Sequence, residues 1–253
     1  MVYPEFLVII PTYNEADNIE SLLGQLLALP VDAGVIVVDD NSPDGTGDLV
    51  EKWVALHPGR IFPIHRPGKL GFGAAHIAGF RKAMEMGATR IMTMDADFSH
   101  NPLYIPDMLA LSEKVDVVIG SRYVAGGGSR NCTRKRILLS RWANSYARLM
   151  LGLEAHDATA GFRLYHRSVL ESIPLNTIFS SGYSFLIEML FMCQRRGWRV
   201  GETPIIFEDR RAGTTKISRQ EILKAQYTVL RLFMRRLGRS KPLYPEVSLP
   251  SSS

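Results

Sequence analysis

The sequence contains few cysteines and no long apolar run. Only two of its 253 residues are cysteine, and the spacing of Cys132 and Cys193 matches no metal-binding or disulfide-exchange motif, so we assign them no chemistry. No apolar stretch approaches the roughly 20 residues that a membrane-spanning helix needs. The N-terminus shows no basic region followed by an apolar signal core. We therefore expect a cytoplasmic protein.

Acidic residues are scarce in two parts of the chain. Residues 122–153 contain seven Lys or Arg and no Asp or Glu. Residues 217–253 contain seven Lys or Arg against two Glu, which accounts for the whole formal net charge of +5. A basic run is often only a solvated surface. The alternative is that these two segments bind an anionic ligand or an anionic surface.

The first 120 residues alternate between short apolar runs and segments with helical spacing. The apolar runs, rich in Val and Ile, are residues 6–10, 35–38, 61–64, 91–94 and 115–119. Continuous runs of this kind are typical of strands buried on both faces of a mostly parallel sheet. Stripes such as Ile19, Leu22, Leu23, Leu26 and Leu27 predict helices between them. The fold class is therefore α/β, with a Rossmann-like, mostly parallel sheet flanked by helices.

After residue 120 the alternation loosens. We expect a glycine loop at 126–128, helices at 137–151, 184–196 and 219–237, and strands at 161–165 and 205–207. The last residues, rich in Pro and Ser, are typical of a loose tail. We therefore predict a catalytic domain over residues 1–217, followed by a basic amphipathic helix and a loose tail over residues 218–253.

Polar and acidic side chains follow three of the expected strands. They are Pro11-Thr12-Tyr13-Asn14-Glu15 after the first, Asp39-Asp40-Asn41-Ser42-Pro43-Asp44-Gly45 after the second, and Asp95-Ala96-Asp97 after the fourth. In open parallel sheets, ligands bind beyond the carboxyl ends of the strands. Any one Asp could serve only as a turn or helix cap. Three clusters at one edge favour a ligand, because gathered carboxylates repel one another unless a cation or hydrogen-bond donor holds them.

Asp95 and Asp97 flank a single residue, so their side chains lie on the same side of an extended strand end. Mg²⁺ or Mn²⁺ typically takes one or two carboxylates and fills its other positions with phosphate oxygens and water. Such a metal neutralises a diphosphate leaving group. The segment after the third strand, Lys69-Leu70-Gly71-Phe72-Gly73, lacks the third glycine of a dinucleotide fingerprint, so we expect it to form a wall of the donor site.

Five motifs, taken in order, resemble the dolichol-phosphate (polyprenol-phosphate) mannosyltransferase family of inverting GT-A glycosyltransferases. They are Pro11-Thr12-Tyr13-Asn14-Glu15, Val38-Asp39-Asp40-Asn41-Ser42-Pro43-Asp44-Gly45-Thr46, Met94-Asp95-Ala96-Asp97-Phe98-Ser99-His100, Gly120-Ser121-Arg122-Tyr123 and Gly161-Phe162-Arg163. The resemblance runs from about residue 6 to residue 217. More distant members of the inverting superfamily share the first three motifs only.

The resemblance implies a GT-A fold and transfer of mannose from GDP-mannose to dolichyl or polyprenyl monophosphate with inversion. The donor side would involve Pro11, Tyr13, Glu15, Asp39, Asp40, Lys69 and Ala96. The metal, Mg²⁺ or Mn²⁺, would bind Asp95 and Asp97, with Ser99 as a further ligand. A late basic loop would bring Arg210 and Lys216 to the donor diphosphate, although Thr215 stands where that family has serine.

On the acceptor side, the resemblance implies that Arg122, Arg136 and Ser140 hold the lipid phosphate. Guanidinium forks suit phosphate, and the acid-free segment supplies them. A phosphate monoester has its second pKa near about 6, so its oxygen is already an anionic nucleophile and needs no catalytic base. We therefore expect Asp95, Asp97, Arg122 and Arg136 to carry the reaction.

The apolar residues of the last expected helix form one stripe: Leu223, Tyr227, Leu230, Met234 and Leu237. A basic amphipathic helix of this kind suits the anionic cytosolic face of a membrane, or it packs on the domain or on a membrane-anchoring subunit. No nucleic acid is expected as a partner. Two other functions stay open, namely a polyprenyl-phosphate glucosyl- or N-acetylglucosaminyltransferase that uses a UDP-sugar, and a non-catalytic scaffold subunit.

Overall fold

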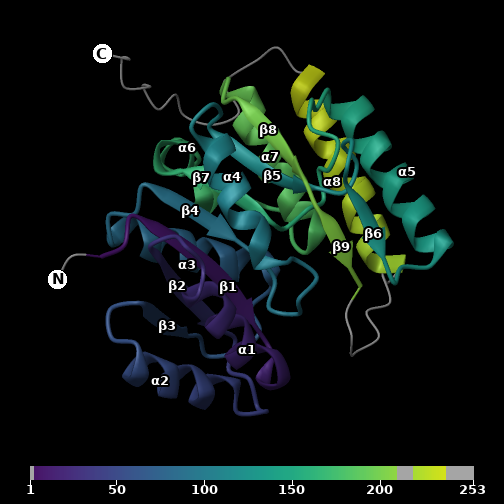
Figure 1. Ribbon diagram of the computed structural model, residues 1–253. Coiled ribbons are helices and arrows are strands. Elements are labelled where there is room, and N and C mark those ends of the chain that lie inside the picture. Colours follow the sequence, from purple (N-terminus) through teal and green to yellow (C-terminus); the bar gives the residue numbers. More distant parts are fainter. Residues whose placement is uncertain (1–2, 210–218, 238–253) are drawn as a thin grey trace, which may run out of the picture.

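The computed structural model describes residues 3–209 and 219–237, and its centre is a seven-stranded sheet (Figure 1). The strand order is β3-β2-β1-β4-β7-β5-β8. The bounds are β1 Phe6–Thr12, β2 Ala33–Asp39, β3 Ile61–His65, β4 Arg90–Thr93, β5 Val117–Ser121, β7 Arg163–His166 and β8 Val200–Pro204. All neighbours pair in parallel except β7, which is antiparallel to both β4 and β5. The predicted α/β class with a mostly parallel sheet is confirmed.

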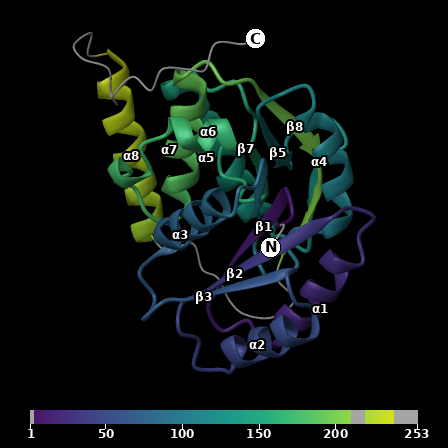
Figure 2. The same ribbon diagram turned by 90° about the vertical axis from the view of Figure 1, so that its left-hand side faces the viewer.

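Helices cover both faces of this sheet (Figure 2). One face carries α1 Ala16–Leu27, α2 Thr46–Leu56 and α4 Ile105–Ser112, with the short 3₁₀ helix η1 Pro102–Tyr104 leading into α4. The other carries α3 Phe72–Glu85, α5 Arg134–Leu151, α6 Arg167–Ser172, α7 Tyr183–Arg195 and α8 Arg219–Leu237, with the 3₁₀ helix η2 Leu175–Thr177. A small second sheet pairs β6 Gly128–Arg130 with β9 Ile206–Glu208.

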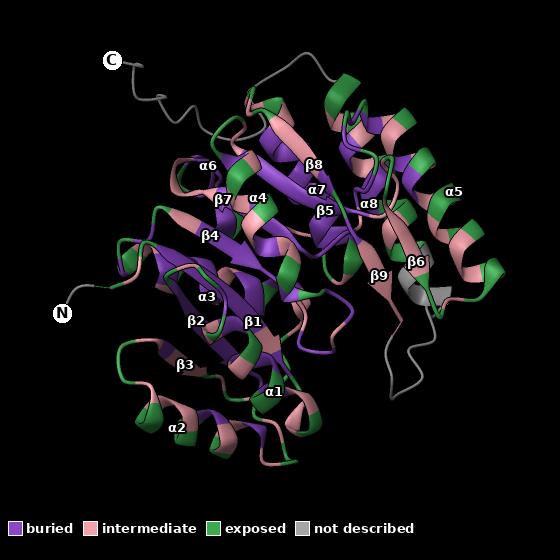
Figure 3. Cartoon of the chain, in the orientation of Figure 1, coloured by how far each residue is buried: buried purple, intermediate pink, exposed green. Residues whose placement is uncertain are grey.

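The core divides along the pleat of the strands. In β1, Leu7 and Ile9 pack into the cluster beneath α3 and α7, whereas Val8 and Ile10 pack into the cluster beneath α1. Side chains alternate faces along a strand, so a strand covered on both sides must be apolar throughout. Burial follows this pattern, with the central strands buried and the outer surfaces of the helices exposed (Figure 3).

The second half of the chain differs from expectation in three places. The expected glycine loop is present only in part, because Gly128 begins β6. Its neighbour Gly127 lies so close to β5 that an added Cβ would be 2.6 Å from the Ser121 carbonyl oxygen. Strand β8 and the short helix α6 were not predicted. The last helix begins and ends at the predicted residues, and it packs on α5 and α7. The domain division at residue 217 stays a prediction.

Candidate active site

The loops after β1 and β2 are tied together by side-chain hydrogen bonds. The Thr12 hydroxyl donates to an Asp39 carboxylate oxygen at 3.0 Å, and the Ala16 amide donates to Asp44 at 3.0 Å. The Glu15 amide donates to the Thr46 hydroxyl at 3.0 Å. These bonds satisfy the open amides at the start of α1 with side chains from the next loop. The first two predicted clusters therefore form one surface at the carboxyl edge of the sheet.

Asp39 and Asp40 have different partners although they are adjacent. Asp39 accepts hydrogen bonds from Thr12 and Ser42. Asp40 pairs with the buried Arg66 at 2.6 Å. Burial raises the pKa of Asp40 above its ordinary value, and the Arg66 cation opposes that rise. Arg66 was not among the residues predicted from the sequence, where its only signal is its place directly after the third strand.

Tyr13 and Lys69, predicted for the donor site, lie together. The Lys69 ammonium is 4.2 Å from the centroid of the half-exposed Tyr13 ring. A cation over an aromatic face is attracted by the ring quadrupole. The loop after β3 thereby contacts the loop after β1. That it forms a wall of the donor site stays a prediction. Pro11, also predicted for the donor site, is partly buried one residue before the end of β1.

Asp95 and Asp97 follow β4, and three neighbouring residues shape their segment. The Ser99 amide donates to an Asp97 oxygen at 3.0 Å, and Phe98 adopts a left-handed φ of 58°. That conformation is uncommon outside glycine and is often found at ligand sites. The Asp95 amide donates to Nδ1 of His100 at 3.3 Å. Ala96, between the two carboxylates, is buried.

His100 is buried and stacks on Phe162 with 5.1 Å between the ring centroids. Burial lowers its pKa to about 4, although the Asp97 carboxylate acts in the opposite direction. The imidazole is therefore neutral near pH 7, in agreement with an Nδ1 that accepts a hydrogen bond.

Three oxygen-bearing side chains near this turn line a common cavity, namely Asp95, Asp97 and Ser99. The Ser99 hydroxyl is buried and has no hydrogen-bond partner among the described residues. A buried polar atom without a partner commonly marks a place for a ligand, water or ion. Hard oxygen donors fit Mg²⁺ or Mn²⁺. Within residues 3–209 and 219–237, no group of three His, Cys, Asp or Glu could hold a metal. A metal bound here would therefore take its remaining ligands from phosphate oxygens and water.

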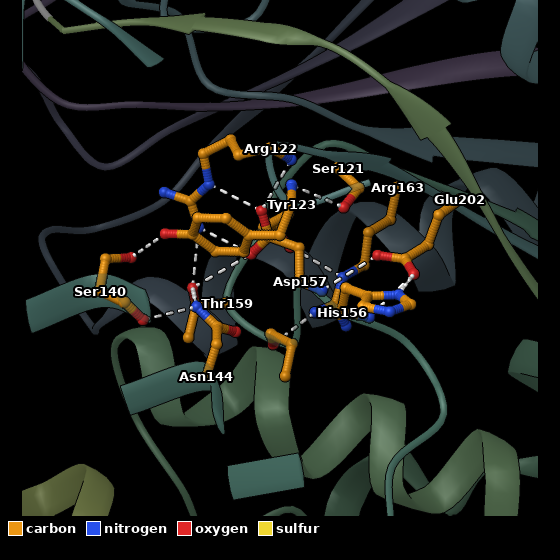
Figure 4. A network of polar contacts seen from close by, with 12 residues as sticks. Ser121, Arg122, Tyr123, Ser140, Asn144, His156, Asp157, Thr159, Arg163 and Glu202 are labelled. Atoms are coloured by element: carbon orange, nitrogen blue, oxygen red, sulfur yellow. Dashed lines mark hydrogen bonds and ion pairs between the residues drawn. The ribbon is translucent and has the colours of Figure 1, made fainter. Parts of the chain in front are cut away.

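Arg122, which directly follows β5, makes a two-pronged ion pair with the buried Asp157 (Figure 4). Its Nε and Nη2 each donate to a different Asp157 oxygen at 2.7 Å. Burial lowers the pKa of Arg122, but the Asp157 carboxylate outweighs this and raises it overall. For Asp157 the Arg122 cation likewise outweighs burial, and its pKa is lowered.

The other predicted acceptor residues also have protein partners. Arg136 on α5 forms an ion pair with Asp209, and the Ser140 hydroxyl accepts from Tyr123 at 2.7 Å. Sequence reasoning missed the roles of Asp157 and Asp209, although the first stands just before the Gly161-Phe162-Arg163 motif and the second opens the late basic loop. The predicted donor contacts Arg210 and Lys216 lie outside the described residues.

A single cavity brings the predicted metal residues and both arginines together. Its polar lining includes Asp95, Asp97, Arg122, Arg136 and Ser140. Its apolar lining comes from α5, α7 and α8, and includes Leu139, Trp142, Tyr146, Leu186, Ile187 and Val229. From Arg136 to Tyr146 the lining extends roughly 15 Å along α5, at 1.5 Å per residue. The cavity thus joins a region lined by charged side chains to a region lined by apolar side chains.

Helix α8 presents its apolar stripe outward. Leu223, Tyr227, Leu230, Met234 and Leu237 are all exposed. Two of its arginines turn inward, with the Arg231 and Arg235 guanidinium carbons 3.9 and 5.1 Å from the Phe179 ring centroid. Across the described ranges, no helix combines the length and apolar character needed to cross a bilayer.

The fold and its carboxylate pair after β4 define the chain as a GT-A glycosyltransferase. The chain belongs to glycosyl transferase family 2, whose family model matches residues 7–173. It is 42% identical over 237 residues to the polyprenol monophosphomannose synthase of Mycolicibacterium smegmatis, covering 93% of this chain and 89% of that protein. It is 45% identical over 213 residues to the undecaprenyl-phosphate mannosyltransferase of Micrococcus luteus, covering 84% and 87%. The resemblance drawn from the motifs is confirmed.

Solved structures resemble the fold at low sequence identity. Glucosyl-3-phosphoglycerate synthase from Mycobacterium tuberculosis, in complex with Mn²⁺, UDP and glucosyl-3-phosphoglycerate, superposes with a TM-score of 0.64 at 20% identity, covering 91% of this chain and 80% of that one. A mannosyltransferase from Pyrobaculum calidifontis, in complex with GDP-Man and Mn²⁺, gives a TM-score of 0.60 at 18% identity, covering 95% and 66%. These two support the fold.

Proposed function

We propose that the protein transfers mannose from GDP-mannose to a polyprenyl monophosphate with inversion of configuration at the anomeric carbon. The observation that carries this proposal is the cavity that joins Asp95 and Asp97 to Arg122 and Arg136 and continues along apolar side chains of α5, α7 and α8. A polyprenyl phosphate has the same two parts, an anionic head and a hydrocarbon tail. The names of both curated relatives support the same acceptor class and the same sugar.

On the donor side, Asp95, Asp97 and the unpartnered Ser99 hydroxyl would hold Mg²⁺ or Mn²⁺. When bound, such a metal neutralises the charge that builds on the departing diphosphate. Pro11, Tyr13, Glu15, Asp39, Asp40 and Lys69 would bind the nucleotide, with Ala96 beside it and Arg210 and Lys216 at the diphosphate.

On the acceptor side, Arg122, Arg136 and Ser140 would position the lipid phosphate. One phosphate oxygen attacks the anomeric carbon, the bond from that carbon to the donor diphosphate breaks, and GDP leaves with the bonding electrons. The phosphate is already anionic near pH 7, so no side chain has to remove a proton. In this account the buried His100 is not a catalytic base. Its Nδ1 accepts a hydrogen bond from the Asp95 amide, and the anionic acceptor carries no proton that has to be removed.

A UDP-sugar is the second candidate donor, because the structurally similar Mycobacterium tuberculosis enzyme is bound to UDP. A test offers radiolabelled GDP-mannose, UDP-glucose and UDP-N-acetylglucosamine to the enzyme with short-chain polyprenyl phosphate, with and without Mn²⁺. We expect transfer from GDP-mannose only, and only with metal. Asp97→Asn should abolish it, whereas Asp107→Asn, which changes an exposed aspartate on α4, should not. Transfer by UDP-sugars alone, or full activity of Asp97→Asn, would refute the proposal.

We further propose that the enzyme works on the cytosolic face of a membrane. The outward stripe of α8 is one reason. Helix α5 packs beside α8 and exposes Leu138, Trp142 and Leu149 along one side, with Arg134, Lys135 and Arg141 also exposed. Apolar side chains among basic ones suit an anionic bilayer surface. A membrane-anchoring subunit is the alternative occupant of this surface.

A further inference from the structure

The ion pair of Arg122 and Asp157 lies beside the proposed acceptor site. Asp157, in the loop between α5 and β7, is 0% exposed. Its Oδ2 accepts from the Arg122 amide at 3.1 Å and from Arg122 Nε at 2.7 Å. Its Oδ1 accepts from Arg122 Nη2 at 2.7 Å and from the Thr159 hydroxyl at 3.3 Å. Four donors therefore saturate this carboxylate.

The geometry decides which part of Arg122 can meet a ligand. The Nε and Nη2 edge of the guanidinium, which could grip a phosphate with two parallel bonds, is turned to Asp157. Nη2 also donates to the Thr159 hydroxyl at 2.9 Å. Arg122 nevertheless lines the cavity. The guanidinium can therefore offer only its Nη1 end to an acceptor.

A second layer of contacts fixes Asp157 itself (Figure 4). Glu202 on β8 accepts from the Asp157 amide at 3.0 Å and from the His156 amide at 2.8 Å. On the other side, the Thr159 hydroxyl accepts from the Asn144 amide group of α5 at 3.1 Å. The loop is thus held by β8 and α5 at once. By contrast, both members of the Arg136 and Asp209 pair are partly exposed.

We propose that Asp157 is a positioning residue for sugar transfer: it holds Arg122 so that the Nη1 end alone contacts the acceptor phosphate. The inference rests on the proposed function. Asp157 also cancels the charge of Arg122, so the phosphate meets an oriented donor and not an uncompensated cation. A phosphate bound too tightly in the ground state would gain affinity without gaining rate.

A second ion pair with a similar bonding pattern lies just before β5 and β8, and it is more exposed: its side chains are 68% and 16% exposed, against 15% and 0% for Arg122 and Asp157. Asp116 accepts from the Arg199 amide and Nε with one oxygen and from Arg199 Nη2 with the other, at 2.8, 3.2 and 3.2 Å. This pair repeats the bonding pattern of Asp157 and Arg122, but neither of its members lines the cavity. Asp116→Asn is therefore the control variant, because it removes the carboxylate of an ion pair with this bonding pattern away from the cavity.

The experiment measures initial rates of mannose transfer against acceptor concentration for wild type, Asp157→Asn and Asp116→Asn, with Tm recorded for each. We expect Asp157→Asn to lower kcat by ~10- to 100-fold, as a misplaced group does, without raising the KM for polyprenyl phosphate. Asp116→Asn should leave both constants unchanged. Unchanged kcat in Asp157→Asn, or a raised acceptor KM with normal kcat, would overturn the inference.

A milder variant decides the matter if Asp157→Asn does not fold. Thr159→Val removes the hydrogen bonds that the threonine hydroxyl makes with Arg122, Asp157 and Asn144, while leaving the ion pair of Arg122 and Asp157. We expect a several-fold lower kcat with unchanged acceptor KM, and wild-type values in both constants would overturn the inference. Absence of transfer by the wild-type enzyme would instead count against the proposed function.

Discussion

Replacing Leu230 and Leu237 of α8 by serine should weaken binding of the protein to anionic vesicles. Full burial of a leucine side chain contributes about 1.5–3 kcal/mol. Leu230 is 48% exposed and Leu237 is 65% exposed, so roughly half of that value is still available to each on contact with lipid. The pair then contributes about 1.5–3 kcal/mol to binding, which corresponds to a loss of about 10- to 150-fold in affinity.

The assay is flotation with vesicles of phosphatidylcholine and phosphatidylglycerol over a range of lipid concentrations. Leu56 on α2 and Leu103 in η1 are 70% and 73% exposed, and they lie on the helices of the other sheet face. The double variant Leu56→Ser/Leu103→Ser is therefore a control with the same chemistry. Because all four side chains are exposed, each change should alter the free energy of unfolding by only about 0.5 kcal/mol or less.

We expect that only the α8 variant loses vesicle binding, and that it keeps its activity on a short-chain acceptor in detergent. Equal losses in both double variants would indicate general adhesion of apolar surface to lipid. An α8 variant that binds vesicles within threefold of wild type would show that this stripe does not contact lipid.

Four further outcomes follow. Chelation of divalent cations should abolish transfer, and Mn²⁺ or Mg²⁺ should restore it in wild type but not in Asp97→Asn. Arg136→Ala should lower kcat/KM for the acceptor by about 10- to 150-fold, the value of one charge-assisted hydrogen bond of about 1.5–3 kcal/mol; unchanged acceptor kinetics would exclude Arg136 from phosphate binding. Asp209→Asn should lower the acceptor KM by up to about fivefold, because a partly exposed carboxylate beside Arg136 competes with the phosphate; a raised KM would contradict this. Burial lowers the pKa of His76 to about 4 from 6.5, so on acidification the unfolded state takes up the proton first. The free energy of unfolding should therefore fall by about 3 kcal/mol as the pH drops from above 6.5 toward 4. Urea unfolding of His76→Phe, measured over the same pH range, should lack this part of the loss.

The parts of the fold that could be predicted are those that depend on local patterns. Strand β1 reads as an unbroken apolar run because both of its faces are buried, and its position was predicted within two residues. Helix α8 was predicted with its observed bounds. The Asp95 and Asp97 pair was recognised because a strand end places its ligand-binding residues at the carboxyl edge of the sheet.

The parts that could not be predicted depend on contacts between distant residues. Strand β7 inserts antiparallel between β4 and β5, an order that no local pattern encodes. Arg122 finds its partner Asp157 35 residues along the chain, and Arg136 finds Asp209 73 residues along. The family resemblance therefore implied the arginines as phosphate ligands, but the sequence could not show that each already faces a carboxylate.

The central claim, that a lipid phosphate attacks the donor sugar directly, is tested by the identity and anomeric configuration of the product. The enzyme is incubated with GDP-mannose and either polyprenyl phosphate or the corresponding polyprenol, and the anomeric one-bond ¹³C–¹H coupling of the purified product is measured by NMR. We predict a β-mannosyl phosphate from polyprenyl phosphate and no product from polyprenol. An α-linked product, or transfer to the unphosphorylated alcohol, would contradict the account.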